Sequence, residues 1–111
     1  MMSTSRRVRR GSSAINFASV NAAALPSLPI IVHRWLPDGK RWGVEWVARN
    51  PKRPDRNLGS FKINLHSGRW ADFATGATGG DVVSLAAYLF GLSQTEAARK
   101  IAEMLSVGAG R

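Results

Sequence analysis

Apolar and polar residues alternate strictly from Phe61 to His66, which is the pattern of a strand with one buried face. Phe61, Ile63 and Leu65 are expected to point inward, and Lys62 with its polar neighbours outward. Residues 41–48 alternate in a similar way, which predicts another strand before this one. A third short strand is expected at residues 69–73, after a tight turn at 67–68. Two successive hairpins predict a small three-stranded antiparallel sheet.

In the first of these strands, Trp42, Val44 and Trp46 are expected on one face. Apolar residues recur at helical spacing on both sides of the strand region, in residues 16–25, 27–36, 82–90 and 94–105. Helix starts are indicated by Asn16, Ser27, Asp81 and the Ser-x-x-Glu capping box that begins at Ser93. The predicted fold class is therefore α+β, a ribbon-like sheet packed with N-terminal and C-terminal helices.

The chain has 111 residues, enough for one domain, which we expect at 14–107. Residues 1–13 contain four arginines and little apolar surface, so they are expected to form a disordered basic arm. Residues 108–111 are expected to be a flexible tail. The apolar stretches are much shorter than a membrane span, and no signal-peptide core follows the basic start, so a cytoplasmic protein with no membrane association is expected.

Composition excludes several kinds of chemistry. The absence of cysteine removes disulfides, thiol catalysis and thiolate zinc sites, and two histidines make a poor metal site, so no metal or cofactor is expected. The seven carboxylates are scattered, and no paired acidic motif is present, so no catalytic residue is predicted. Asp72 is interpreted as a structural residue that bonds N–H groups of the turn after it. The Gly-rich stretch at 74–80 is interpreted as a connector rather than a phosphate loop.

Charge indicates a polyanionic partner. The net charge is +9, and residues 1–62 hold all of the surplus, with twelve basic and three acidic side chains. Nucleic acid is the commonest such partner. The alternative is that the positive charge only keeps the protein soluble and belongs in part to a disordered basic tail. The charge alone leaves both interpretations open.

Basic and aromatic residues are interleaved through the strand region, which suits the binding of a single strand by stacking and phosphate contacts. Most of the aromatics Trp35, Trp46, Phe61 and Trp70 are expected inside the core, with one or two aromatics left exposed. The predicted nucleic-acid-binding residues are a candidate stacking residue and six basic residues: Trp42, Arg41, Lys52, Arg53, Arg56, Lys62 and Arg69.

A hairpin is followed in order by W-x-D-F, a Gly-rich turn, G-D-V-V-S-L and G-L-S-x-x-E-A-A. This order resembles the N-terminal zinc-ribbon domain of bacterial and phage DNA primases. The likeness covers about residues 42–107, is sharpest at 59–89, and is closest to the N-termini of phage and plasmid primase-helicases. It implies a ribbon that helps to recognise template DNA.

The ligands of that family would flank the first hairpin loop and the segment from Trp70 to Gly76, and this chain has no cysteine there. We therefore expect packing to replace the metal, for example Trp46 against Trp70 and Phe73. The family's catalysis is attributed to a separate acidic domain, so this chain is not expected to make primers.

The sequence thus predicts a zinc-free, primase-ribbon-like protein, not an enzyme, that binds DNA. Single-stranded DNA is the preferred form, and a role as a replication accessory of a phage or mobile element is expected. The alternative is a protein-interaction module, in which the helices at residues 82–105 dock on a helicase or polymerase and the charge is incidental.

Overall fold

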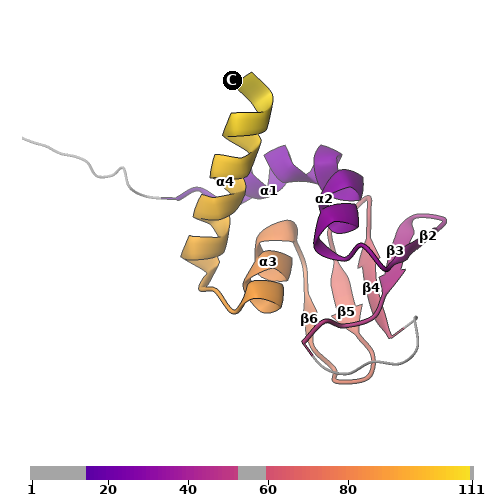
Figure 1. The fold of residues 1–111 in the computed structure, drawn as a ribbon. Coiled ribbons are helices and arrows are strands. Elements are labelled where there is room, and N and C mark those ends of the chain that lie inside the picture. Colours follow the sequence, from indigo (N-terminus) through magenta and orange to yellow (C-terminus); the bar gives the residue numbers. More distant parts are fainter. Residues whose placement is uncertain (1–14, 53–59, 111) are drawn as a thin grey trace, which may run out of the picture.

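A computed structural model describes residues 15–52 and 60–110. The predicted arm at 1–13 lies outside the described residues. Four α-helices and one 3-10 helix are combined with an antiparallel sheet, so the mixed α+β class is confirmed for the described part of the chain. Figure 1 shows the helices gathered on one side of the molecule and the strands on the other.

Within residues 15–52 and 60–110, the sheet has five strands rather than the three that the sequence predicts. They follow the chain in the order β2-β3-β4-β5-β6, and each pairs antiparallel with the next. Their bounds are β2 (Lys40–Trp42), β3 (Glu45–Ala48), β4 (Phe61–Asn64), β5 (Trp70–Asp72) and β6 (Thr78–Gly79).

The first extra strand arises because the predicted strand at 41–48 is broken by a turn. Gly43 has a φ of +62°, a conformation that glycine adopts without steric cost. The turn pairs Trp42 with Glu45 across β2 and β3. Trp42 and Trp46 consequently lie on opposite faces of the sheet, and the prediction that they share a face is wrong.

The second extra strand, β6, lies in the Gly-rich stretch, for which the sequence predicts only a connector. Thr78 and Gly79 pair with Ala71 and Trp70 of β5, and the Thr78 hydroxyl donates a 2.9 Å hydrogen bond to the Trp70 carbonyl oxygen. Glycine at position 79 lets the Trp70 indole lie directly against the backbone of β6.

The N-terminal helices form one nearly continuous unit. Helix α1 (Phe17–Ala24) is capped as predicted, because the Asn16 side chain accepts a 3.0 Å hydrogen bond from the Ser19 N–H. It leads through the 3-10 helix η1 (Leu25–Ser27) into α2 (Leu28–Trp35). Ser27 precedes α2, but its side chain makes no capping hydrogen bond.

Both C-terminal helices begin at the predicted residues, and α3 also ends where predicted. Helix α3 (Val82–Phe90) opens with a capping box between Asp81 and Ser84 and ends at Gly91, whose φ is +65°. Helix α4 (Gln94–Gly110) follows the reciprocal hydrogen bonds of Ser93 and Glu96. Its backbone is still helical at 108–110, where the sequence predicted a tail.

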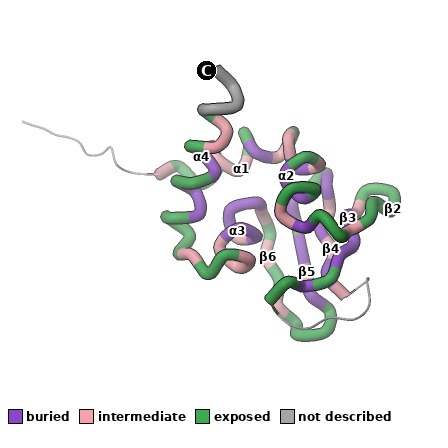
Figure 2. Tube along the Cα trace, viewed as in Figure 1, coloured by how far each residue is buried: buried purple, intermediate pink, exposed green. Residues whose placement is uncertain are grey.

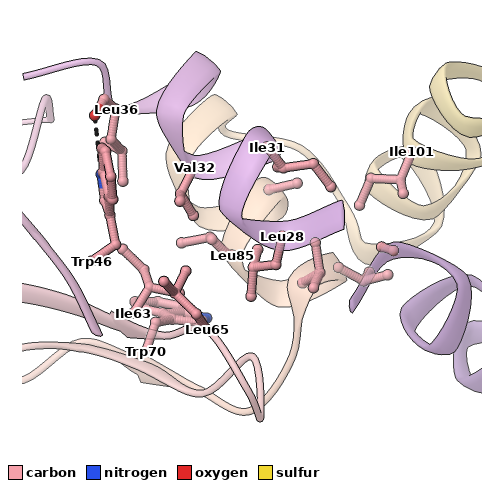
Figure 3. Close-up of a cluster of buried hydrophobic side chains, with 14 of the residues drawn as sticks. Leu28, Ile31, Val32, Leu36, Trp46, Ile63, Leu65, Trp70, Leu85 and Ile101 are labelled. Atoms are coloured by element: carbon pink, nitrogen blue, oxygen red, sulfur yellow. Dashed lines mark hydrogen bonds between the residues drawn. The ribbon is translucent and has the colours of Figure 1, made fainter. Parts of the chain in front are cut away.

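Helices α2 and α3 cover one face of the sheet, which we call the inner face (Figure 3). Leu28 and Val32 of α2 and Leu85 of α3 are buried with side chains from the strands. The predicted inward positions Phe61, Ile63 and Leu65 are all buried, as are Trp46 and Trp70. The Trp46 indole N–H donates a 3.0 Å hydrogen bond to the Leu36 carbonyl oxygen, which attaches β3 to the end of α2.

Candidate nucleic-acid interface

The opposite side of the sheet carries the candidate interface. Side chains alternate between the faces along each strand, so the neighbours of the buried residues point away from α2 and α3. We call this surface the outer face, and define it by the residues that share that direction in the strand register or just beyond the ends of β5: Lys40, Trp42, Glu45, Val47, Lys62, Asn64, Arg69, Ala71, Phe73 and Thr78. Of these, Val47 is buried. Figure 2 shows exposed positions at the β2 edge and in the turn at the lower end of β5. Along β4 and β5, buried and half-buried residues alternate.

Two aromatic side chains are exposed on the outer face. Trp42 is 58% exposed on the edge strand β2, and Phe73 is 69% exposed just after β5. The Phe73 N–H donates a 2.7 Å hydrogen bond to the Ser60 carbonyl oxygen, which extends the pairing of β5 with the chain before β4. Trp42 and Phe73 therefore lie at opposite ends of the face, on strands separated by β3 and β4.

Cationic side chains lie between these aromatics. The Lys62 ammonium is 5.6 Å from the centroid of the Phe73 ring, within the range of a cation–π contact. Arg69, one residue before β5, is exposed on the same face. Glu45, opposite Asn64 in the register, is the acidic member of the group. Lys40 of β2 is exposed and lies opposite Val47, on the same face as Lys62. The face thus offers three cations and a carboxylate beside two exposed aromatics.

The centre of the outer face is hollowed. A depression of about 290 Å³ is lined by Glu45, Lys62, Asn64, Arg69, Trp70, Ala71, Phe73 and Thr78. Ala71 lies between Lys62 and Thr78 in the register and has the smallest side chain among these residues.

The structure brings together three of the seven residues predicted to bind nucleic acid. Trp42, Lys62 and Arg69 share the outer face. The strand register places Arg41 on the other side of β2, where it lines a separate depression with Pro26 and Leu65. Its Nε donates a 3.1 Å hydrogen bond to the Gly43 carbonyl oxygen.

Lys52 is also directed elsewhere. Its ammonium is 5.2 Å from the centroid of the Tyr88 ring of α3, on the helical side of the molecule. Arg53 and Arg56 lie outside the described residues. The sequence analysis did not predict Phe73 as a binding residue. Phe73 lies one residue past the short strand β5, so the direction of its side chain depends on the pairing of its backbone with residue 60.

Asp72 has the structural role that the sequence indicated. It is buried, and its Oδ1 accepts a 2.9 Å hydrogen bond from the Ala74 N–H in the turn. Its other oxygen accepts a 2.6 Å hydrogen bond from the Asn50 amide. The Asn50 amide is also 2.8 Å from the Tyr88 hydroxyl.

This polar cluster joins the two segments at which the resemblance would place metal ligands. The packing that we expected there is wrong in one respect, since Phe73 is exposed and does not join the core. Trp46 and Trp70 instead flank Ile63 in the register, and Trp70 packs against Phe61 and Tyr88 with centroid distances of 5.9 and 4.8 Å.

Three comparisons with known proteins bear on identity. No protein-family model, no curated protein and no solved structure matches the chain. The likeness to primase zinc-ribbon domains therefore rests on the sequence alone and stays a prediction.

Two further properties concern the described residues as a whole. Within residues 15–52 and 60–110, no three His, Cys, Asp or Glu side chains come together in a way that could hold a metal ion. None of the helices in the described part of the chain has the length and apolar character that a membrane crossing requires.

Proposed function

We propose that this protein binds single-stranded DNA through the outer face of its sheet, as a binding protein rather than an enzyme. The observation that carries the proposal is the pair of exposed aromatics, Trp42 and Phe73, on the face that also presents Lys62 and Arg69. Exposed aromatic rings beside cations provide both the stacking surfaces and the phosphate contacts by which proteins hold an unpaired strand.

The chemistry of the face favours an unpaired strand over a duplex. Aromatic rings stack on the faces of bases, and those faces are accessible only when the bases are not stacked within a helix. The cations at Lys62 and Arg69 supply the sequence-independent attraction to phosphates. A role as an accessory of replication in a phage or mobile element rests on the likeness to primase ribbons.

A titration of labelled single- and double-stranded oligonucleotides across a salt series tests the proposal. The single strand should bind more tightly, and its affinity should fall with salt by about 0.7 log units per log unit for each phosphate contact. The double variant Lys62→Ala/Arg69→Ala should flatten that slope by about 1.4 because two contacts are lost. The control Arg99→Ala/Lys100→Ala removes the same charge from exposed positions of α4 and should leave the slope unchanged.

Equal effects of the two double variants would reject the outer face as the binding surface. Wild-type protein that fails to bind either oligonucleotide at about 50 mM salt would reject DNA binding itself.

A second candidate function is docking on a replication protein such as a helicase or polymerase. The observation that favours it is an apolar groove of about 360 Å³ between α2, α3 and α4, lined by residues that include Trp35, Phe90 and Met104. Phe90 is 52% exposed there. In this case Phe90→Lys should abolish association with the purified partner and leave oligonucleotide binding intact. The reverse result, lost oligonucleotide binding with the partner retained, would reject the groove.

A further inference from the structure

We propose that the hollow over Ala71 receives one nucleobase of the bound strand. This inference rests on the proposed function and specifies how one base is held. Ala71 forms the floor of the hollow, with Lys62 beside it on β4 and Thr78 beside it on β6. Arg69 and Phe73, two residues away on either side, point to the same face of β5 and form the remaining walls.

The size of the hollow suits a single base. Its volume of about 290 Å³ is just below the range of sites for drug-sized ligands, about 300–1,000 Å³, and a single base is smaller than such a ligand. The Phe73 ring offers an exposed face for stacking, and the Arg69 guanidinium at the other end can stack on a base or bind its phosphate. A base between them would lie over Ala71, where a larger side chain would exclude it.

Polar groups at the rim can contact the edge of a base. The Asn64 side-chain oxygen already accepts 2.9 Å hydrogen bonds from the His66 and Ser67 N–H groups, which holds the amide in place. The Thr78 hydroxyl donates to the Trp70 carbonyl oxygen and keeps acceptor capacity toward the hollow. Glu45 adds a carboxylate acceptor. Groups ordered before binding lose little freedom when a ligand arrives.

Contacts on the inner face fix the position of the strand that carries Ala71. On the inner face, the Trp70 indole N–H donates a 3.0 Å hydrogen bond to the Ser84 hydroxyl of α3. The same residue pairs with Ile63 and Gly79 on its two neighbouring strands. Ala71, adjacent to it in the chain, is therefore held at a fixed height relative to the walls of the hollow.

Alanine at this position is not explained by sheet stability. Alanine is disfavoured in strands relative to β-branched residues, and residue 71 is paired on both sides within the sheet. Replacing Ala71 with isoleucine should therefore fill the hollow on the outer face without weakening the fold. The melting temperature of Ala71→Ile shows whether the variant is folded, and so distinguishes a filled hollow from a loss of structure.

The test combines Ala71→Ile with an abasic scan of a labelled five-nucleotide strand, in which each base in turn is replaced by an abasic site. Wild-type protein should lose affinity most strongly at one position, by about 5- to 150-fold, the equivalent of the roughly 1–3 kcal/mol typical of one stacked base. Ala71→Ile should bind the intact strand correspondingly more weakly, and the penalty at that position should disappear. The control Ala18→Leu enlarges an exposed alanine of α1 and should behave as wild type.

A wild-type protein that binds the strand without any position-dependent loss would overturn the hollow and leave the proposed function standing. Binding of the intact strand by Ala71→Ile as tightly as by wild type would also overturn the hollow as a base site. If Ala71→Ile does not fold, Ala71→Val replaces it, because valine fills part of the hollow. The abasic scan of the wild type then still shows whether one base is held more tightly than the others. Absence of binding by the wild type would reject the proposed function, and the hollow with it.

Discussion

The side-chain amide of Asn50 donates a 2.6 Å hydrogen bond to the buried carboxylate of Asp72. This contact joins the end of β3 to the end of β5 across β4, and the Tyr88 hydroxyl of α3 lies 2.8 Å from the same amide. Two loops and a helix are thus held together by hydrogen bonds at the place where we expect packing to replace the metal of primase ribbons. The cluster keeps β5, and with it the outer face, at a fixed position relative to α3.

Asn50→Ala should lower the free energy of unfolding by about 1.5–3 kcal/mol, because it removes a donor to a buried charged group. Urea unfolding monitored by tryptophan fluorescence measures the change. Gln94→Ala, at an exposed residue of α4, serves as the control and should change stability by less than about 0.5 kcal/mol. A loss in Asn50→Ala no larger than in this control would show that the cluster does not stabilise the fold.

Sequence reasoning located most elements because their signals are local. The helix starts at Asn16, Asp81 and Ser93 follow from side chains that hydrogen-bond to N–H groups three residues later. The missed strands lack such signals. Gly43 interrupts an otherwise alternating run, and Thr78–Gly79 pairs through its backbone with almost no apolar pattern.

The candidate site was predictable only in part, for a related reason. Strict alternation in β4 correctly predicted that Lys62 lies on the other face of the sheet from the inward-facing Phe61 and Ile63. Proximity in sequence could not separate Trp42 from Arg41, since adjacent residues of a strand point to opposite faces. The direction of Phe73 depends on a long-range hydrogen bond to Ser60, which a single sequence does not reveal.

Two neighbouring glycines should respond differently to alanine. A Cβ at Gly79 would overlap the Trp70 indole and the Ser84 hydroxyl, whereas a Cβ at Gly80 would meet nothing within 4 Å. Gly79→Ala should therefore destabilise the protein by about 1–3 kcal/mol, the cost typical of overpacking. Gly80→Ala should be neutral or slightly stabilising. Thermal unfolding of both variants checks the difference, and similar losses in the two would contradict the close packing of Trp70 on β6.

Acidification should weaken the start of α4 through Glu96. The hydrogen bond from the Ser93 backbone N–H, assisted by the Ser93 hydroxyl and the nearby Lys100 and Arg99, lowers the pKa of Glu96 below its usual value. A carboxyl with a lower pKa in the folded state stabilises the fold at pH values above its unfolded pKa of about 4.3. That contribution is lost as the pH falls through the lower folded pKa.

The stability difference between wild type and Glu96→Gln should consequently be constant near neutral pH and shrink between about pH 5 and 3. Urea unfolding at a series of pH values gives this difference directly. Glu103→Gln, which replaces an exposed carboxyl further along α4, is the control. A gap between wild type and Glu96→Gln that stays constant down to pH 3 would show that the capping box does not depend on the charge of Glu96.

The two exposed aromatics of the outer face should each contribute to single-strand affinity. Trp42→Ala and Phe73→Ala should each weaken binding of a long single strand by about 1–3 kcal/mol, the range for loss of one stacked base. Both side chains are more than half exposed, so the melting temperature should change little. Phe90→Ala removes an aromatic of comparable exposure from α3, away from the outer face, and should leave oligonucleotide affinity unchanged.

Because Trp42 and Phe73 lie on strands separated by β3 and β4, they do not share a contact, and their losses should add in the double variant. Fluorescence anisotropy with wild type and these variants measures the losses: an effect of Phe90→Ala equal to that of the outer-face variants would place the strand on the helices instead of the sheet.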